Sequence, residues 1–107
     1  MQDTDPKPVR VETAAELDAL IDDYERLLVE FVTEGCGTCA AMEPVLGVVA
    51  TETGVPVVVV NPRDDPGLID RFDVRSVPTL VLFEDGEAVD RLSEGFVGAE
   101  RIVEFLS

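Results

Sequence analysis

The chain has 107 residues, which is enough for one domain and too little for two independent cores. Its 23 acidic and 8 basic side chains leave a formal net charge of -15, which opposes binding to nucleic acid or to an anionic membrane surface. The longest uncharged apolar run, Val55 to Val60, is far shorter than the roughly 20 residues of a membrane-spanning helix. The sequence therefore predicts one globular domain with neither nucleic acid nor a membrane as partner.

Hydrophobic periodicity and turn residues predict short alternating strands and helices after a polar lead over residues 1–7. Thr13 and Glu16 form a capping box, Asp65 is placed to cap a short helix, and Asp85–Gly86 predicts a hairpin turn. The elements expected in a domain over residues 8–107 are strand 8–11, helix 14–25, strand 27–32, helix 37–54, strand 55–60, helix 66–72, strands 79–83 and 88–92, and helix 99–106. This order predicts an α/β fold in which parallel units precede an antiparallel hairpin.

Acidic residues are spread through the whole chain, and Lys7 is its single lysine. This composition resembles that of proteins from organisms with molar salt in the cytoplasm, where a Debye length of about 3 Å weakens the repulsion. An ordinary acidic protein is the alternative. Residues 1–7 contain neither the basic nor the apolar segment of a secretory signal, so we expect a cytoplasmic protein.

Cys36 and Cys39 are the two cysteines of the chain, and they follow a predicted buried strand at the start of a predicted helix. The lack of histidine excludes Cys–His nucleophile pairs and histidine metal ligands. At a helix start the first sulfur faces unpaired N–H groups and the positive end of the helix dipole, which stabilise a thiolate. We therefore expect thiol–disulfide exchange, with Cys36 as the nucleophile and Cys39 as the resolving thiol.

Three other interpretations of this cysteine pair stay open. A structural disulfide across so short a loop would remove little entropy from the unfolded chain. A zinc or iron–sulfur site needs about four ligands, so two chains would have to share one metal. The pair could also be two incidental buried cysteines. We expect no metal and no bound cofactor.

Glu30 interrupts the otherwise apolar strand over residues 27–32. If the side chain is buried, its pKa rises because the charged form loses its hydration. The alternative is that strand twist brings the carboxylate to solvent.

Several segments together resemble the thioredoxin family, both in identity and in mutual spacing. They are the strand Leu28–Val32, the CGTC motif at 36–39, Pro44, the Ser-Val-Pro-Thr segment at 76–79, the Asp85–Gly86 turn and Gly95. The resemblance covers about residues 8–107. It implies the thioredoxin fold, a central mixed β-sheet of four to five strands with about four helices on its two sides, and a cis peptide bond before Pro78.

The same resemblance implies roles for individual residues. Cys36 would attack the disulfides of substrate proteins, Glu30 would accept the proton of Cys39 through water, and a reductase would regenerate the dithiol. The positions that would contact a substrate are Gly35, Gly37, Thr38, Val77, Pro78 and Gly95. For Pro78 the alternative to substrate binding is a trans proline that only begins a strand. For Gly95 the alternative is a glycine that only forms a turn. We expect a monomer.

Three positions depart from the family pattern. Gly35 replaces the usual tryptophan and removes an aromatic contact surface, which favours the alternative of a protein-binding adaptor with a vestigial or regulatory cysteine pair. Thr38 replaces the usual proline, and its added N–H and hydroxyl group predict a more stable Cys36 thiolate and a more oxidising couple. Val59 replaces a lysine, so we expect no cation beside Glu30.

Overall fold

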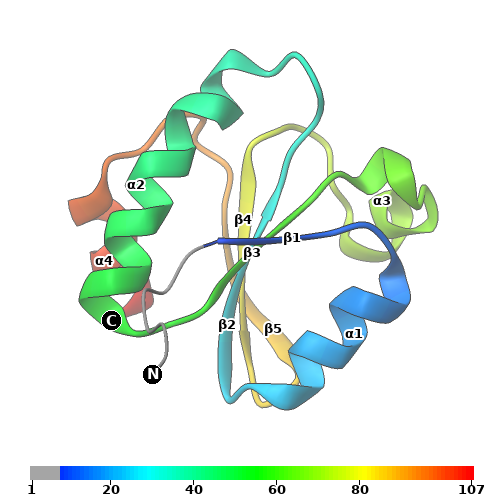
Figure 1. The fold of residues 1–107 in the computed structure, drawn as a ribbon, viewed down its shortest axis with the longest axis horizontal. Coiled ribbons are helices and arrows are strands. Elements are labelled where there is room, and N and C mark those ends of the chain that lie inside the picture. Colours follow the sequence, from blue (N-terminus) through cyan, green and yellow to red (C-terminus); the bar gives the residue numbers. More distant parts are fainter. Residues whose placement is uncertain (1–7) are drawn as a thin grey trace, which may run out of the picture.

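The computed structural model describes residues 8–107 as a five-stranded sheet with four α-helices and one short 3₁₀ turn (Figure 1). The elements are β1 (Val9–Val11), α1 (Ala14–Asp23), β2 (Arg26–Phe31), α2 (Gly37–Thr53), β3 (Val57–Val60), η1 (Pro62–Asp64), α3 (Gly67–Phe72), β4 (Thr79–Glu84), β5 (Glu87–Leu92) and α4 (Ala99–Leu106). The polar lead expected over residues 1–7 lies outside the described residues. Within the described chain, no helix is long and apolar enough to cross a membrane.

The sheet is mixed, as expected, and its strand order is β1-β3-β2-β4-β5. Strands β1, β3 and β2 are parallel, β4 is antiparallel to β2, and β5 is antiparallel to β4. The carboxyl ends of β1, β3, β2 and β5 and the amino end of β4 therefore meet at one edge. The segments that leave this edge are the ones that carry the cysteines, Pro78 and Gly95.

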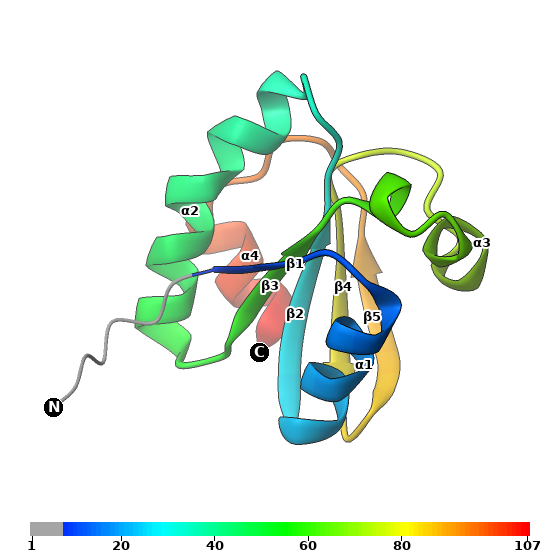
Figure 2. The same cartoon turned by 45° about the vertical axis from the view of Figure 1, so that its right-hand side comes forward.

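Helices α2 and α4 cover one face of the sheet, and α1 and α3 cover the other (Figure 2). Alternate side chains of a strand point to opposite faces, so Leu28 packs with Leu46 of α2 while Val29 packs with Leu17 of α1. By the same alternation Glu30 faces α2. The otherwise apolar stretch of β2 after Arg26 thus presents its one acid, Glu30, to the helix that begins with the cysteine motif.

Two local predictions differ in their outcome. The hairpin is confirmed, because Asp85 and Gly86 have φ values of 52° and 86° and connect β4 to β5. The predicted cap is wrong: α3 begins at Gly67 after Pro66, with no side-chain cap. The Asp65 Oδ2 atom instead accepts a hydrogen bond of 2.9 Å from the N–H of Ala14, the first residue of α1. Because the fold brings Asp65 close to the start of α1, its side chain caps α1 and not α3.

Candidate active site

The two cysteines form a disulfide at the amino end of α2, with their Cα atoms 5.2 Å apart. Cys36 is the N-cap residue, and its sulfur accepts a hydrogen bond of 3.0 Å from the N–H of Cys39. Cys39 is buried at 5% exposure, whereas Cys36 is only half-buried. The first sulfur is therefore the accessible one, and it accepts an N–H group of the helix start, as expected from the sequence.

The turn between β2 and α2 gives the motif its position. Gly35 has φ of +76°, a left-handed conformation that side chains other than glycine rarely adopt. Apart from the two chain neighbours, no atom of the described residues lies within 4 Å of the place where a Cβ would stand on Gly35, so the backbone angle and not crowding favours glycine there. Both Gly35 and Gly37 line the pocket described below.

Thr38 follows as an exposed residue of the first turn of α2. Its side chain is not among the described residues that line that pocket. In this oxidised form the N–H of Cys39 donates the hydrogen bond that the Cys36 sulfur accepts. The expected donation from Thr38 to a Cys36 thiolate stays a prediction for the reduced form.

The segment before β4 reaches the cysteines from the neighbouring strand. The Val77–Pro78 peptide bond is cis, as the resemblance implies, so the alternative of a trans proline is wrong. Pro78 is buried, and Val77 packs against the small apolar cluster of Val32, Cys39 and Val59. The structure therefore packs Val77 next to the cysteines, and the buried Pro78 follows it in the chain.

Gly95 lies in the loop between β5 and α4, with φ of +76°. Two contacts hold this loop at the same edge of the sheet: the hydroxyl oxygens of Ser93 and Thr79 are 3.2 Å apart, and the N–H of Val97 donates to Met42 Sδ at 3.5 Å. The next residue, Phe96, is 54% exposed. Sequence reasoning missed this exposed aromatic side chain, because position 96 alone does not reveal whether the ring packs inward.

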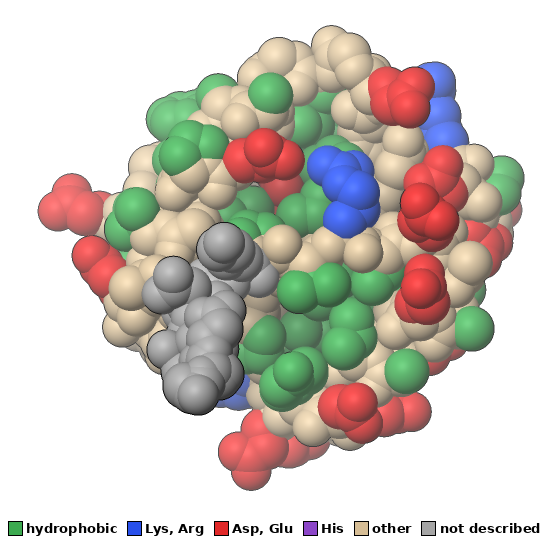
Figure 3. All heavy atoms as spheres, in the orientation of Figure 1, with side chains coloured by type: hydrophobic (Ala, Val, Ile, Leu, Met, Phe, Trp, Pro, Cys, Tyr) green, Lys and Arg blue, Asp and Glu red, His purple; other side chains and the backbone are tan. Residues whose placement is uncertain are grey.

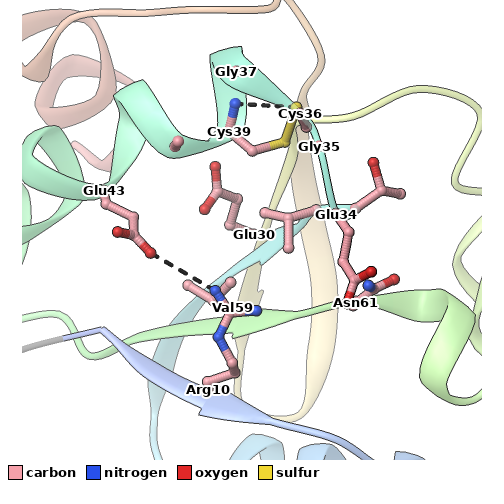
Figure 4. A pocket seen from close by; sticks show the side chains of 13 residues that line it. Arg10, Glu30, Glu34, Gly35, Cys36, Gly37, Cys39, Glu43, Val59 and Asn61 are labelled. Atoms are coloured by element: carbon pink, nitrogen blue, oxygen red, sulfur yellow. Dashed lines mark hydrogen bonds and ion pairs between the residues drawn. A yellow bond between two sulfur atoms is a disulfide. The ribbon is translucent and has the colours of Figure 1, made fainter.

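Glu30 is completely buried, and neither of its carboxyl oxygens has a hydrogen-bond partner among residues 8–107. Its side chain lines a pocket of about 440 Å³ that also touches Cys36 and Cys39 (Figure 4). The alternative of a solvent-exposed carboxylate is therefore wrong. The pKa of Glu30 is raised to about 7, mainly because burial disfavours the charged form; the negative charge of Glu43 contributes to this rise and the positive charge of Arg10 opposes it.

The prediction that no cation lies beside Glu30 is also wrong. Arg10 of β1 lines the same pocket and its charge acts on the Glu30 carboxyl group. The strand pairing explains this, because both Arg10 and Glu30 are aligned with Val59 of the strand between them. The sequence places Arg10 in an edge strand, but without the register it does not place it near Glu30.

The pocket holds two more polar residues that sequence reasoning missed, Glu43 and Asn61. Glu43 stands one helical turn after Cys39, so helical spacing from the motif was the signal that could have found it. Within residues 8–107 no three side chains of ligand type are grouped to hold a metal ion. The chemistry of the site is that of two sulfurs and one buried acid.

The model of the thioredoxin family matches residues 8–107. The chain belongs to the thioredoxin family. It is 38% identical over 84 residues to the thioredoxin of Chlamydia muridarum, covering 76% of this chain and 79% of that one. It is also 38% identical over 66 residues to the thioredoxin of Porphyra purpurea, covering 60% of this chain and 62% of that one.

Solved thioredoxins share the fold. A mutant thioredoxin from Halobacterium salinarum NRC-1 superposes with a TM-score of 0.88 at 30% identity, covering 98% of this chain and 92% of that chain. Fasciola hepatica thioredoxin superposes with a TM-score of 0.80 at 27% identity, covering 92% of this chain and 95% of that chain. The thioredoxin fold expected from the sequence is confirmed.

Proposed function

We propose that this member of the thioredoxin family is a thiol–disulfide oxidoreductase that reduces disulfide bonds in other proteins. The observation that supports this most is the Cys36–Cys39 disulfide at the amino end of α2, with the half-buried sulfur accepting an N–H of the helix. A pair held in this way can cycle between dithiol and disulfide without moving the backbone far.

The proposed reaction has two exchange steps. The Cys36 thiolate attacks one sulfur of a substrate disulfide, which forms a mixed disulfide and releases the first substrate thiolate. The Cys39 sulfur then attacks Cys36, which forms the disulfide of the oxidised protein and releases the second substrate thiolate. Two electrons pass from the dithiol to the substrate, and each released thiolate takes up a proton according to its own affinity.

Glu30 is proposed to accept the proton that Cys39 loses in the second step. Support comes from the pocket that both side chains line and from the burial of a carboxyl group that has no hydrogen-bond partner within residues 8–107. Because the pKa of Glu30 is raised to about 7, mainly by burial, both protonation states of the acid are populated near neutral pH. A base that is poised near the working pH is suited to proton transfer.

Substrate proteins are proposed to bind along the sheet edge around Cys36. The proposed contact positions are Gly35, Gly37, Thr38, Val77, Pro78 and Gly95. Exposure of Gly35, Gly37, Thr38 and Gly95 supports this, because they offer accessible backbone next to the half-buried Cys36. Exposed Phe96, beside Gly95, supplies an aromatic surface at this edge, which Gly35 does not.

Repeated turnover requires a reductase as electron donor, which reduces the Cys36–Cys39 disulfide back to the dithiol. We place this cycle in the cytoplasm, where thiols are kept reduced. The acidic surface supports a monomer adapted to high salt, because side chains of Asp and Glu dominate the charged positions on the visible face (Figure 3). Like charges repel a second copy at low ionic strength.

Reduction of insulin by dithiothreitol tests the proposed activity. We expect the wild-type protein to accelerate insulin precipitation, Cys36→Ser to abolish the acceleration, and Cys39→Ser to trap a mixed disulfide. A protein-binding adaptor would not accelerate the reaction at all, so an unaccelerated rate with the wild-type protein contradicts the proposal.

A single-turnover experiment tests the proposed role of Glu30. Decay of a preformed mixed disulfide between Cys36 and a small chromogenic thiol reports the attack by Cys39. We expect Glu30→Gln to slow this decay by roughly 10²-fold at neutral pH, the lower end for general bases. Glu52→Gln, which removes an exposed acid of α2 that does not line the pocket, serves as the control.

A further inference from the structure

Arg10, Val59 and Glu30 form one row across three neighbouring strands. Arg10 of β1 and Glu30 of β2 are both aligned with Val59 of β3, and residues aligned across a sheet point to the same face. Helix α2 covers that face and places Glu43 opposite the row, where its Oε2 atom lies 3.7 Å from Nη2 of Arg10. All four side chains line the pocket that reaches the disulfide.

The geometry of the row lets Arg10 act on Glu30. Neighbouring strands are about 4.8 Å apart, so the backbones of β1 and β2 are separated by about 10 Å, with only the short side chain of Val59 between them. Glu30 lies between the disulfide and the ion pair of Arg10 with Glu43 (Figure 4). A guanidinium group on a long side chain is able to reach across this separation, and in the structure it pairs with Glu43.

The charges around Glu30 come from a few elements. Within residues 8–107, β1 contributes Arg10, α2 contributes Glu43, and the loop before α2 contributes Glu34. Cys36 and Cys39 are joined in the disulfide and do not titrate in this form. The residues on this side from β3, from the position after it and from β4 are neutral: Val59, Asn61 and Leu80. Arg10 is therefore the one cation, within the described chain, that lines the pocket.

The ion pair of Arg10 with Glu43 is a weak one. Their side chains are 57% and 60% exposed, so water and salt screen the attraction between them. Glu30, by contrast, is buried and has, in the part of the chain that the structure describes, no hydrogen-bond partner for its negative charge. Arg10 lowers the pKa of Glu30, and Glu43 raises it. Two acids thus compete for the same guanidinium group.

We propose that Arg10 is a positioning residue shared between Glu43 and Glu30, so that this ion pair controls how readily Glu30 takes the proton of Cys39. This inference rests on the proton-accepting role proposed above for Glu30. In that step the S–H bond of Cys39 breaks, the proton binds a carboxylate oxygen of Glu30, and the sulfur electron pair forms the bond to Cys36 as the substrate thiolate leaves. Arg10 stabilises the carboxylate form that accepts the proton, and Glu43 opposes it.

Titration of the Glu30 side-chain carboxyl carbon by NMR in the oxidised protein tests the inference directly, because the cysteines do not titrate there. At low salt we expect Arg10→Gln to raise the proton affinity of Glu30 by roughly threefold and Glu43→Gln to lower it by roughly threefold. The double variant should lie between the two. In molar KCl, where the Debye length is about 3 Å, the differences should shrink toward zero.

The ion pair of Arg71 with Asp18 supplies matched controls. It lies between α3 and α1 on the opposite face of the sheet, and its side chains are 47% and 44% exposed. Arg71→Gln and Asp18→Asn change the net charge as the test variants do, and we expect neither to move the Glu30 titration. Unshifted titrations in both Arg10→Gln and Glu43→Gln, or shifts equal to those of the controls, overturn the inference.

The mixed-disulfide decay separates this inference from the role of Glu30 itself. Arg10→Gln should move the pH profile of decay to higher pH by the shift seen in the titration, and Glu43→Gln should move it to lower pH. A Glu30→Gln variant that decays at the wild-type rate overturns the proposed role of Glu30. A slow Glu30→Gln variant together with unshifted profiles in the other two overturns the role of Arg10 alone.

Discussion

The raised pKa of Glu30 makes the folded protein less stable as pH rises from about 4 to about 7. Burial and the negative charge of Glu43 together raise the pKa of Glu30 to about 7, and the positive charge of Arg10 opposes this rise. Below about pH 4 the acid is protonated in both folded and unfolded chains and costs nothing. Between there and about pH 7 the folded state holds a proton that the unfolded state has released, so stability falls as pH rises.

Replacement of Glu30 by glutamine should remove this fall. We expect the free energy of unfolding of Glu30→Gln, measured against wild type in urea, to improve by up to about 3 kcal/mol between about pH 5 and about pH 8. Glu52→Gln, which removes an exposed acid of α2, controls for net charge. A Glu30→Gln difference that does not change with pH would contradict the burial of an unpaired carboxyl group.

Thr38 is the residue at which the reduction potential can be tested. It lies in the first turn of α2, where an N–H without a helical partner can stabilise a thiolate at Cys36. We expect Thr38→Pro to make the potential, measured against glutathione, more negative by roughly 20 to 40 mV. Thr38→Val keeps the N–H and should give a smaller change. An unchanged or higher potential in Thr38→Pro refutes the argument.

At the level of elements, local signals were sufficient for most of the fold. The capping box of α1 is present in both directions, from the N–H of Glu16 to Thr13 and from the N–H of Thr13 to Glu16. The Asp85–Gly86 turn connects the predicted strands, and the cysteine motif begins the predicted helix. Each of these depends on residues a few positions apart, whose chemistry determines the local backbone.

Features that depend on the pairing of distant segments were not predictable in the same way. The sequence gives no register between β1 and β3, so it could not place Arg10 in the row with Glu30. Nor does it reveal that Asp65 reaches α1, because that contact joins residues 51 positions apart. Cys36, Cys39 and Glu30 were found because each has a local signature, whereas their charged neighbours have none.

The bond between Asp65 and the N–H of Ala14 should contribute measurably to stability. It satisfies one of the unpaired donors at the start of α1 with a charged acceptor. We expect Asp65→Ala to lower the free energy of unfolding in urea by about 1 to 2 kcal/mol. Asp64→Ala removes a neighbouring exposed acid and should have little effect. Equal effects of the two variants would show that Asp65 acts only through its charge.

At the scale of the whole molecule, the net charge of -15 opposes the compact state. Four of the five ion pairs among residues 8–107 have both side chains more than 40% exposed, so they offset little of this repulsion. The sequence states the total charge, but only the fold shows how little of it is paired at close range. Added salt should therefore stabilise the protein by screening.

Thermal unfolding in increasing KCl tests this expectation. The melting temperature should rise most steeply as the Debye length falls from about 30 Å at low salt to about 3 Å at molar salt. Sucrose at matched osmolality screens no charge and serves as the control. A melting temperature that is flat in KCl, or that rises equally in sucrose, would refute the adaptation to salt.

The central claim is that the amino end of α2 stabilises a thiolate at Cys36. The pH dependence of alkylation of the reduced protein by iodoacetamide, with the modified residue identified by mass spectrometry, measures this most directly. We expect one fast-reacting sulfur, Cys36, with half-maximal rate below the value of about 8.5 for free cysteine, while buried Cys39 stays unmodified. Equal reaction at both cysteines, or a half-maximal rate at or above the free value, would contradict the account.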